Sequence, residues 1–272
     1  MKRLQLTEHD IEDIDMFSRD HVGISTLERY TGSDKDDFQP YILLTNFKKY
    51  LDAFSEITGA PIKHGSAMRA CHCPADKITI IDFGVGSPVA ALIMELISFI
   101  NPKAVLMLGM CGGLSRKYAV GDFFNPLAAI REEGTSNAYM PPQCPALSSF
   151  DIQQFVCEEL KQSQLPYHTG VIHTTNVRFW EFNEPFKKTL QEEHCQAIDM
   201  ECATLFTVGF SRAVPIGALM LISDLPLKAG GVKTKESAKQ VFENFTSQHL
   251  NVGIAVLKNI HAHETATFGD QF

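Results

Sequence analysis

The feature that most constrains the fold of this chain is the alternation of strand-like and helix-like segments along most of its 272 residues. Short apolar runs are followed by longer segments in which apolar residues recur every three or four positions, as on one face of a helix. Strands separated by helices pair largely in parallel and are covered by those helices. The pattern therefore predicts an α/β fold, a single three-layer αβα domain around a central, mostly parallel or mixed sheet.

The elements that this pattern predicts can be assigned by residue range. The expected strands are Pro40–Leu44, Ile78–Phe83, Ala104–Leu108, Phe123–Ile130, Gly170–His173 and Val214–Ile222. The expected helices are Phe47–Thr58, Pro88–Ile100, Asp151–Gln164, Phe182–Glu193, Met200–Arg212 and Lys235–His261. We expect one domain over 29–261, a polar segment over 1–28 and a frayed tail over 262–272.

Charge and cysteine usage exclude several classes of partner. A net charge of −8 and a pI near 5.7 argue against a nucleic-acid-binding protein. The longest apolar stretch, Val89–Ile100, is interrupted by Glu95 and is too short to span a membrane. Seven cysteines at mixed spacings fit a reducing compartment, which favours the cytoplasm. The segment Cys71-His72-Cys73 lacks a second ligand motif, so we expect no metal site.

Two carboxylates stand where apolar elements begin or end. Glu201 opens a helix-like run, with Asp199 as a candidate N-cap, and Asp224 follows a strand-like run. An α/β protein directs side chains at strand ends into its cleft. A proton donor and an anion beside a developing positive charge suit cleavage of a glycosidic bond. The alternative is that both are structural, as a helix cap and a strand-end turn.

Glycine and aromatic segments give further candidate site residues. Phe83–Pro88 is a glycine turn between a strand and a helix, but it lacks the third glycine of a dinucleotide site and the lysine of a P-loop. Leu108–Leu114 is a second glycine cluster, which we expect to form a loop after a strand. Thr174–Phe182 carries the chain's single tryptophan next to an arginine. Such a pair suits a planar base, although packing of the tryptophan on the core is the alternative.

Taken in order, these motifs resemble the nucleoside phosphorylase-I family of purine and uridine phosphorylases and nucleosidases. The resemblance runs from about Arg29 to about Ile260. Segments such as Thr174–Glu181 and Ile222–Leu227 are most similar to the AMP-hydrolysing branch, and they cover its catalytic domain alone. The resemblance implies hydrolysis of AMP to adenine and ribose 5-phosphate, without a metal or an organic cofactor.

The resemblance also implies roles for individual residues. Asp224 would donate a proton to purine N7 and turn the base into a neutral leaving group. Glu201 would accept hydrogen bonds from the ribose hydroxyls and oppose the positive charge of the transition state, with Met200 against the sugar. Gly84 and Gly86 would line the pocket beside the anomeric carbon, where water or phosphate attacks.

The base and the 5′-phosphate also have candidate partners. Thr175, Arg178 and Trp180 fall where the family builds its base pocket. A phosphate dianion in an acidic protein needs local cations, and arginine binds it best. Arg29, Arg131 and Arg178 are the candidates.

Arg29 further implies an assembly. Its segment, Leu27–Gly32, matches the one that in the family reaches a neighbouring subunit's substrate. The resemblance therefore implies a homo-oligomer, specifically a hexamer built as a trimer of dimers.

One departure from the phosphorylases bears on the reaction. Where they carry an arginine and a serine that bind the attacking phosphate, this chain has Met107 and Met110. A thioether cannot donate a hydrogen bond to an oxyanion, so water is the expected nucleophile. The alternatives are a nucleosidase or phosphorylase acting on adenosine, methylthioadenosine or uridine, and a non-catalytic nucleotide sensor. Arg131–Ser136 with Tyr139–Pro142 resembles uridine phosphorylases and keeps the first of these open.

Overall fold

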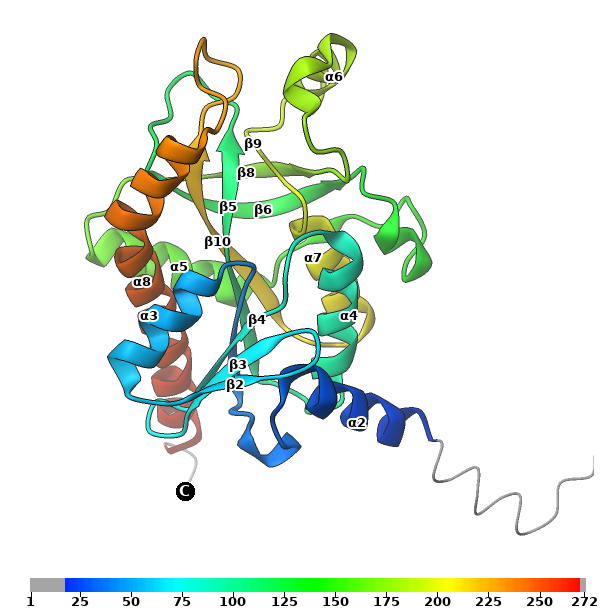
Figure 1. The fold of residues 1–272 in the computed structure, drawn as a ribbon, viewed down its shortest axis with the longest axis vertical. Coiled ribbons are helices and arrows are strands. Elements are labelled where there is room, and N and C mark those ends of the chain that lie inside the picture. Colours follow the sequence, from blue (N-terminus) through cyan, green and yellow to red (C-terminus); the bar gives the residue numbers. More distant parts are fainter. Residues whose placement is uncertain (1–17, 270–272) are drawn as a thin grey trace, which may run out of the picture.

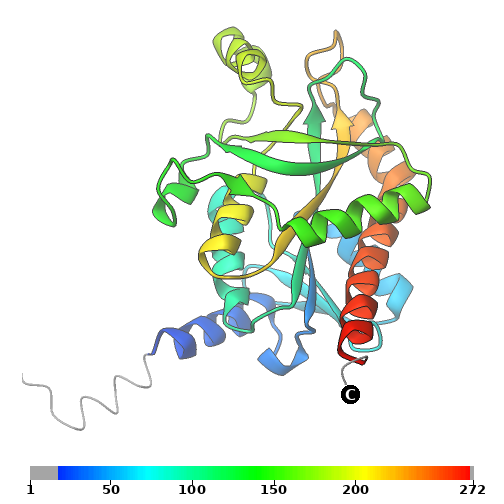
Figure 2. The same cartoon turned by 180° about the vertical axis from the view of Figure 1, so that it is seen from behind.

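The computed structural model describes residues 18–269, in which helices cover both faces of a ten-stranded sheet (Figures 1 and 2). Helices α2, α4 and α7 pack on one face, and α3, α5 and α8 pack on the other. This arrangement confirms the predicted α/β fold with a central sheet between helical layers.

The elements alternate as the sequence predicts, with one further long helix before the first expected strand and four further short strands. The strands are β1 (Tyr41–Thr45), β2 (Ile62–His64), β3 (Arg69–Cys73), β4 (Ile78–Asp82), β5 (Ala104–Gly113), β6 (Phe123–Arg131), β7 (Ala146–Leu147), β8 (Tyr167–Thr174), β9 (Ala197–Asp199) and β10 (Ile216–Asp224). The α-helices are α2 (Arg19–Thr31), α3 (Lys48–Thr58), α4 (Ser87–Ser98), α5 (Phe150–Gln162), α6 (Glu184–Glu192), α7 (Cys202–Ser211) and α8 (Lys235–Gly269). Three 3-10 turns complete them, η1 (Lys35–Asp37), η2 (Thr135–Ala138) and η3 (Trp180–Phe182).

The sheet is mixed and part of it closes on itself. β5 pairs in parallel with β1 and β10, while β9 pairs antiparallel with β5 and parallel with β8. β6 joins β8 in parallel and β10 antiparallel. The strands β5, β9, β8, β6 and β10 therefore form a ring, and the open side continues through β1, β4, β3 and β2. The carboxyl ends of β5, β8, β9 and β10 meet at one edge of this ring.

The core follows the period of two that a buried strand imposes on its side chains. Along β5, Met107 and Cys111 belong to the cluster under α2, α4 and α7. Leu108 and Met110 belong to the cluster under α3, α5 and α8. Because both faces are covered, every residue of β5 is buried, which explains its continuous apolar sequence.

The second glycine cluster is not the loop that we expected. Gly109, Gly112 and Gly113 all lie within β5. A Cβ at Gly112 would stand 3.1 Å from Ile198 Cγ2, and one at Gly113 would stand 2.9 Å from Ile222 Cγ2. These glycines allow neighbouring segments to approach β5 closely, which is the other use of glycine in a strand.

The first and last helices extend past both ends of the expected domain, 29–261. Helix α2 begins at Arg19, and its Leu27 is fully buried in the core. Helix α8 continues beyond His261 to Gly269, and Tyr41 on β1 donates a hydrogen bond to Glu264 at 2.7 Å. Residues 1–17 of the expected polar segment, and 270–272 of the expected tail, lie outside the described residues. No helix within 18–269 has the length and apolarity needed to cross a membrane.

Candidate active site

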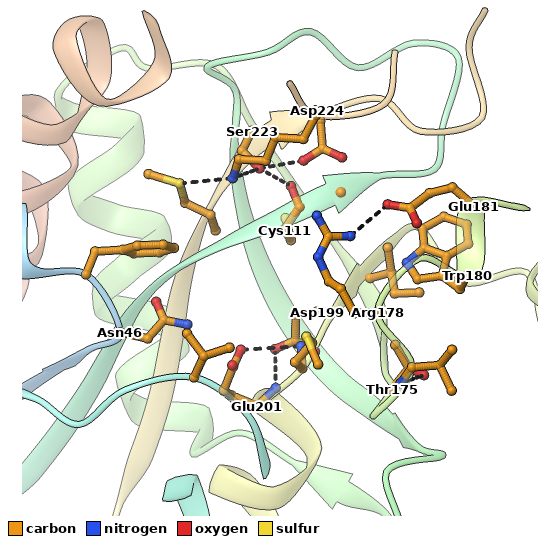
Figure 3. Close-up of a pocket in the computed structure, with 18 residues that line it drawn as sticks. Asn46, Cys111, Thr175, Arg178, Trp180, Glu181, Asp199, Glu201, Ser223 and Asp224 are labelled. Carbon is orange, nitrogen blue, oxygen red and sulfur yellow. Dashed lines mark hydrogen bonds and ion pairs between the residues drawn. The ribbon is translucent and has the colours of Figure 1, made fainter. Parts of the chain in front are cut away.

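A cavity of about 210 Å³ opens where the carboxyl ends of the central strands meet (Figure 3). Its lining includes Glu201, Asp224, Met200, Thr175, Arg178 and Trp180, all of which the sequence singled out. In Figure 3, Glu201 and Asp224 lie on opposite sides of this cavity, and the Arg178–Trp180 segment forms a third side. A larger cavity of about 540 Å³, between α5 and α8, contains neither carboxylate.

Glu201 is held by the backbone of the first glycine turn. The residue is 2% exposed, and its Oε1 accepts a hydrogen bond from the Gly86 amide at 2.7 Å. Its Oε2 accepts from the Met200 amide at 3.3 Å. Gly86 has φ of +101°, a conformation that favours glycine, so the sequence of the turn allows its amide to face the carboxylate. The turn thus positions Glu201, although the cavity is lined by Val85 rather than by Gly84 or Gly86 themselves.

The protonation of Glu201 reflects two opposing effects. Burial raises the pKa of its carboxyl, and the neighbouring Asp199 carboxylate raises it further. The Gly86 and Met200 amides and the Asn46 side chain oppose this shift because they favour the anion. The carboxyl therefore changes charge above the usual range of glutamate, and a donor or positive charge in the cavity would favour its ionised form.

Asp199 caps the start of α7 through its side chain, although the N-cap residue itself is Glu201 and not Asp199 as the sequence suggested. Its Oδ2 accepts hydrogen bonds from the amides of Glu201 at 3.2 Å and Cys202 at 2.7 Å, at the start of α7. Its Oδ1 accepts from the Thr174 hydroxyl at 2.7 Å. Burial raises the pKa of Asp199, and these donors oppose the shift. Asp199 thus fixes the start of the helix that presents Glu201.

Asp224 is the last residue of β10 and faces the cavity from the other side. Burial raises the pKa of its carboxyl, while the Ser223 hydroxyl, which donates to it at 2.6 Å, and the Lys233 ammonium lower it. Lys233 itself donates to Ser223 at 3.1 Å and lies 3.7 Å from the Met110 sulfur. Since burial is the largest of these effects, the neutral acid, which can donate a proton, is favoured more than it is in an exposed aspartate.

The third side of the cavity combines an indole, a guanidinium and a carboxylate. Trp180 is 5% exposed and packs against Phe186 behind the cavity. Arg178 Nη1 donates to Glu181 Oε1 at 2.9 Å, and half of the arginine side chain remains exposed. Thr175 is buried, and its amide donates to Asp199 O at 3.0 Å, which ties this segment to β9.

Two of the three candidate arginines, Arg29 and Arg131, do not line the cavity. Arg29 is exposed on α2, where its guanidinium stacks on Tyr30 at 4.7 Å. Arg131 donates hydrogen bonds to five acceptors of the segment that follows β6: Ser136, Asn137, Pro141, Met140 and Cys144. Its donors therefore close a loop and are not directed at the cavity.

A family model described as the phosphorylase superfamily matches residues 40–258. This chain belongs to the phosphorylase superfamily. AMP nucleosidase of Escherichia coli strain K12 is 29% identical over 302 residues, covering 91% of this chain and 62% of that protein. The chain thus spans about three fifths of the length of this curated relative. Guanosine phosphorylase of Halorubrum lacusprofundi is 28% identical over 61% of this chain and 68% of that protein.

Solved structures give the same family. The crystal structure of AMP nucleosidase from Bacteroides thetaiotaomicron VPI-5482 has a TM-score of 0.81 and 41% identity. It covers 91% of this chain and 100% of that chain. A uridine phosphorylase of Vibrio fischeri ES114 has a TM-score of 0.73 at 20% identity, over 82% of this chain and 93% of that one, which shows a common fold.

Of the two methionines expected at the phosphate site, only Met110 lines the cavity, whereas Met107 is fully buried in the core. Lys233, whose ammonium lies beside Met110, was not predicted from the sequence. The segment 228–233 before α8 has no periodic pattern, so only its position nine residues after Asp224 could have drawn attention to this lysine. Asn46 and Glu181 also line the cavity and were missed.

Proposed function

We propose that this phosphorylase-superfamily chain hydrolyses the N-glycosidic bond of AMP to adenine and ribose 5-phosphate. The observation that carries the proposal is the pair Glu201 and Asp224, two carboxyl groups on opposite sides of one cavity with different surroundings. A nucleotide seated between them would have its base toward one and its sugar toward the other. Similarity to proteins named AMP nucleosidase supports AMP as the substrate.

Asp224 is the proposed acid at purine N7. A neutral carboxylic acid can donate its proton to the departing base, which then leaves as a neutral molecule. Burial at the end of β10 favours that neutral form. After proton transfer, the aspartate would be a carboxylate that accepts from Ser223 and faces Lys233, so the protein already supplies partners for the charged product state.

Glu201 is the proposed anion on the ribose side. Two backbone amides fix its oxygens, so little reorganisation is needed as positive charge develops on the sugar. Ribose hydroxyls that donate to it would favour its ionised form. Met200 would contact the sugar, and the turn containing Gly84 and Gly86 would face the anomeric carbon, where water attacks.

The base and the phosphate would occupy different parts of the site. Trp180, Thr175 and Arg178 would form the wall against adenine. A cavity of about 210 Å³ is below the roughly 300–1,000 Å³ typical of ligand sites, so the 5′-phosphate of a nucleotide would lie at its mouth. The half-exposed Arg178 is the candidate phosphate ligand from the same subunit.

A neighbouring subunit is the proposed source of further phosphate ligands. Arg29 is exposed and lies outside the cavity of its own subunit. A closed homo-oligomer, as a hexamer built from three dimers, would let each Arg29 serve the next subunit's site. The proposed location is the cytoplasm, which the seven free cysteines support.

A second candidate is a phosphorylase or a nucleosidase acting on an unphosphorylated nucleoside. The specific observation in its favour is Lys233, a cation next to Met110, where an attacking phosphate would lie. Its ammonium offers the anion contact that the two methionines cannot supply.

The deciding experiment follows base release from AMP, adenosine, inosine, uridine and methylthioadenosine, with and without inorganic phosphate. We expect adenine release from AMP without phosphate, with ribose 5-phosphate as the second product. Strict dependence on phosphate, with ribose 1,5-bisphosphate formed instead, would overturn hydrolysis as the reaction. Release of base from the unphosphorylated nucleosides in preference to AMP would favour the second candidate. Binding of AMP without release of base under either condition would identify a nucleotide sensor.

A further inference from the structure

A second group of chemically active side chains lies next to Trp180, on the side of the cavity proposed to contact adenine, and takes no part in the proposed reaction. It consists of His173 on β8, Glu193 just after α6 and Cys195 just before β9. One potential ligand atom of each lies within 4.8 Å of the other two. Cys195 shares an apolar cluster with Trp180, which lines the cavity. Among the residues that the structure describes, this group alone has the geometry of a metal site.

His173 and Glu193 place two potential ligand atoms side by side. The histidine side chain is fully buried, and its Nδ1 lies 2.7 Å from Glu193 Oε2. One proton lies between these two atoms, and a cation could take its place, because both atoms then have lone pairs directed toward it. The other ring nitrogen, Nε2, is buried and has no hydrogen-bond partner among the described residues, so Glu193 is the one described hydrogen-bond partner that orients the imidazole.

Cys195 adds a soft ligand to the same group. Cys195 is 8% exposed, and its thiol donates a hydrogen bond to Leu190 O at 3.4 Å. Burial and the nearby Glu193 raise the pKa of the thiol to about 12. A divalent cation would reverse this preference, because it binds the thiolate and releases the proton to solvent.

We propose that His173, Glu193 and Cys195 bind one zinc-class divalent cation. Sulfur, imidazole and carboxylate ligands together select Zn²⁺ over Mg²⁺ or Ca²⁺, which prefer all-oxygen sites. Three protein ligands leave a fourth position for water, and Glu193, whose side chain is 22% exposed, gives access to solvent.

The position of the group defines what the cation would do. His173 pairs with Ile198 in the β8–β9 ladder, and the next pair is Thr174 with Asp199. Cys195 lies two residues before β9. A cation that binds both His173 and Cys195 would therefore hold the start of β9 against β8, close to Asp199, whose side chain caps α7. The role is structural and is independent of the proposed reaction.

The test uses the full chain, stripped of metal by a chelator and then titrated with Zn²⁺ or Co²⁺. We expect one equivalent of either ion to remain bound after gel filtration, and the Co²⁺ form to show the near-ultraviolet absorption of a cobalt–thiolate bond. Cys195→Ser should abolish that absorption, whereas Cys157→Ser, on α5 and outside the group, should retain it. Glu193→Gln should weaken Zn²⁺ binding by about 10- to 100-fold.

Thermal unfolding supplies a second readout. Zn²⁺ should raise the unfolding midpoint of the wild-type chain and of Cys157→Ser, but not that of Cys195→Ser. A wild-type chain that retains no equivalent of Zn²⁺, or a cobalt–thiolate absorption that survives in Cys195→Ser, would overturn the proposal. Should Cys195→Ser not fold, unchanged Zn²⁺ affinity in Glu193→Gln would overturn it instead.

Discussion

The ammonium of Lys233 lies 3.1 Å from the hydroxyl of Ser223, the residue that directly precedes Asp224 on β10. The hydroxyl in turn donates to the Asp224 carboxylate at 2.6 Å, so a positive charge is connected to the proposed acid through one hydrogen-bonded side chain. Burial favours the neutral acid and Lys233 favours the anion. The balance between them sets the pH at which Asp224 can still deliver a proton.

Lys233→Met tests this balance. Removing a cation beside a carboxyl disfavours the anion, so the pKa of Asp224 should rise. The alkaline limb of kcat/KM against pH should therefore move to higher pH. Lys235→Met, an exposed lysine at the start of α8, is the matched control. An alkaline limb that stays in place would show that Lys233 does not act on Asp224.

Asp224→Asn should abolish most turnover while AMP binding is nearly retained. The amide keeps the shape of the side chain and can donate a hydrogen bond, but it cannot transfer a proton. General acid catalysis is worth about 10²- to 10⁴-fold, so kcat should fall by that order. Steady-state kinetics and calorimetric AMP binding measure the two effects, with Asp151→Asn on α5 as the control. Near wild-type turnover would remove Asp224 from the proposed role.

Glu201→Gln should lower kcat by a comparable order, with a smaller effect on KM. The advantage of a carboxylate over an amide appears when positive charge develops on the ribose, so the loss falls on the transition state. A rise in KM with kcat unchanged would instead make Glu201 a ligand of the bound substrate only.

The same variant should be more stable than the wild type in alkali. The pKa of Glu201 is raised in the folded protein, so the protonated form is favoured by folding and stability falls as pH rises through the folded value. Glutamine does not ionise and avoids this loss. At about pH 9 we expect the unfolding midpoint of Glu201→Gln to lie a few degrees higher, since about 1 kcal/mol shifts a chain of this size by ~2–4 °C. The difference should vanish in acid, and a less stable variant at every pH would contradict the prediction.

The three arginines should separate when each is replaced by methionine and AMP is compared with adenosine. Arg29→Met should reduce AMP cleavage selectively, because Arg29 is proposed to contact the 5′-phosphate of the AMP bound in a neighbouring subunit. Arg178→Met should also act mainly on AMP. Arg131→Met should affect both substrates equally and lower the unfolding midpoint, because its five acceptors would lose their donor. Arg116→Met, on an exposed loop, is the control. Selectivity in none of the three would contradict AMP as the substrate.

The long elements of the fold were predictable because their pattern is local. The expected strands from Pro40 and Ile78, and the helices from Phe47 and Pro88, differ from the observed ones by at most two residues at either end. The strands β2 and β9 were missed because three residues carry no periodicity, and their pairing depends on distant partners. The extension of β5 through Gly113 was missed for a similar reason, since the glycine signal for a turn is the same as that for close packing.

The site residues that could be predicted and those that could not also differ in the kind of segment that carries them. Glu201 and Asp224 could be found because each stands at the end of a regular element, where its direction follows from the element. Lys233 and Glu181 come from irregular segments, and only the folded chain places them at the cavity. Arg131 is of a residue type that binds phosphate, but its guanidinium is not directed at the cavity. It donates instead to acceptors in the segment that follows β6.

The glycines at the end of β5 restrict where this site can change in evolution. A side chain at Gly112 would press on Ile198 and Pro226, and one at Gly113 would press on Ile222 and Leu225. Such contacts would disturb β9 and β10, the strands that lead to the two carboxylates. New substrate preferences are therefore expected in the segment 175–181 and at Lys233, which line the cavity outside these strands. Close packing at these two glycines keeps the strands beneath the cavity constant, and substrate preference can vary in the residues that line its sides.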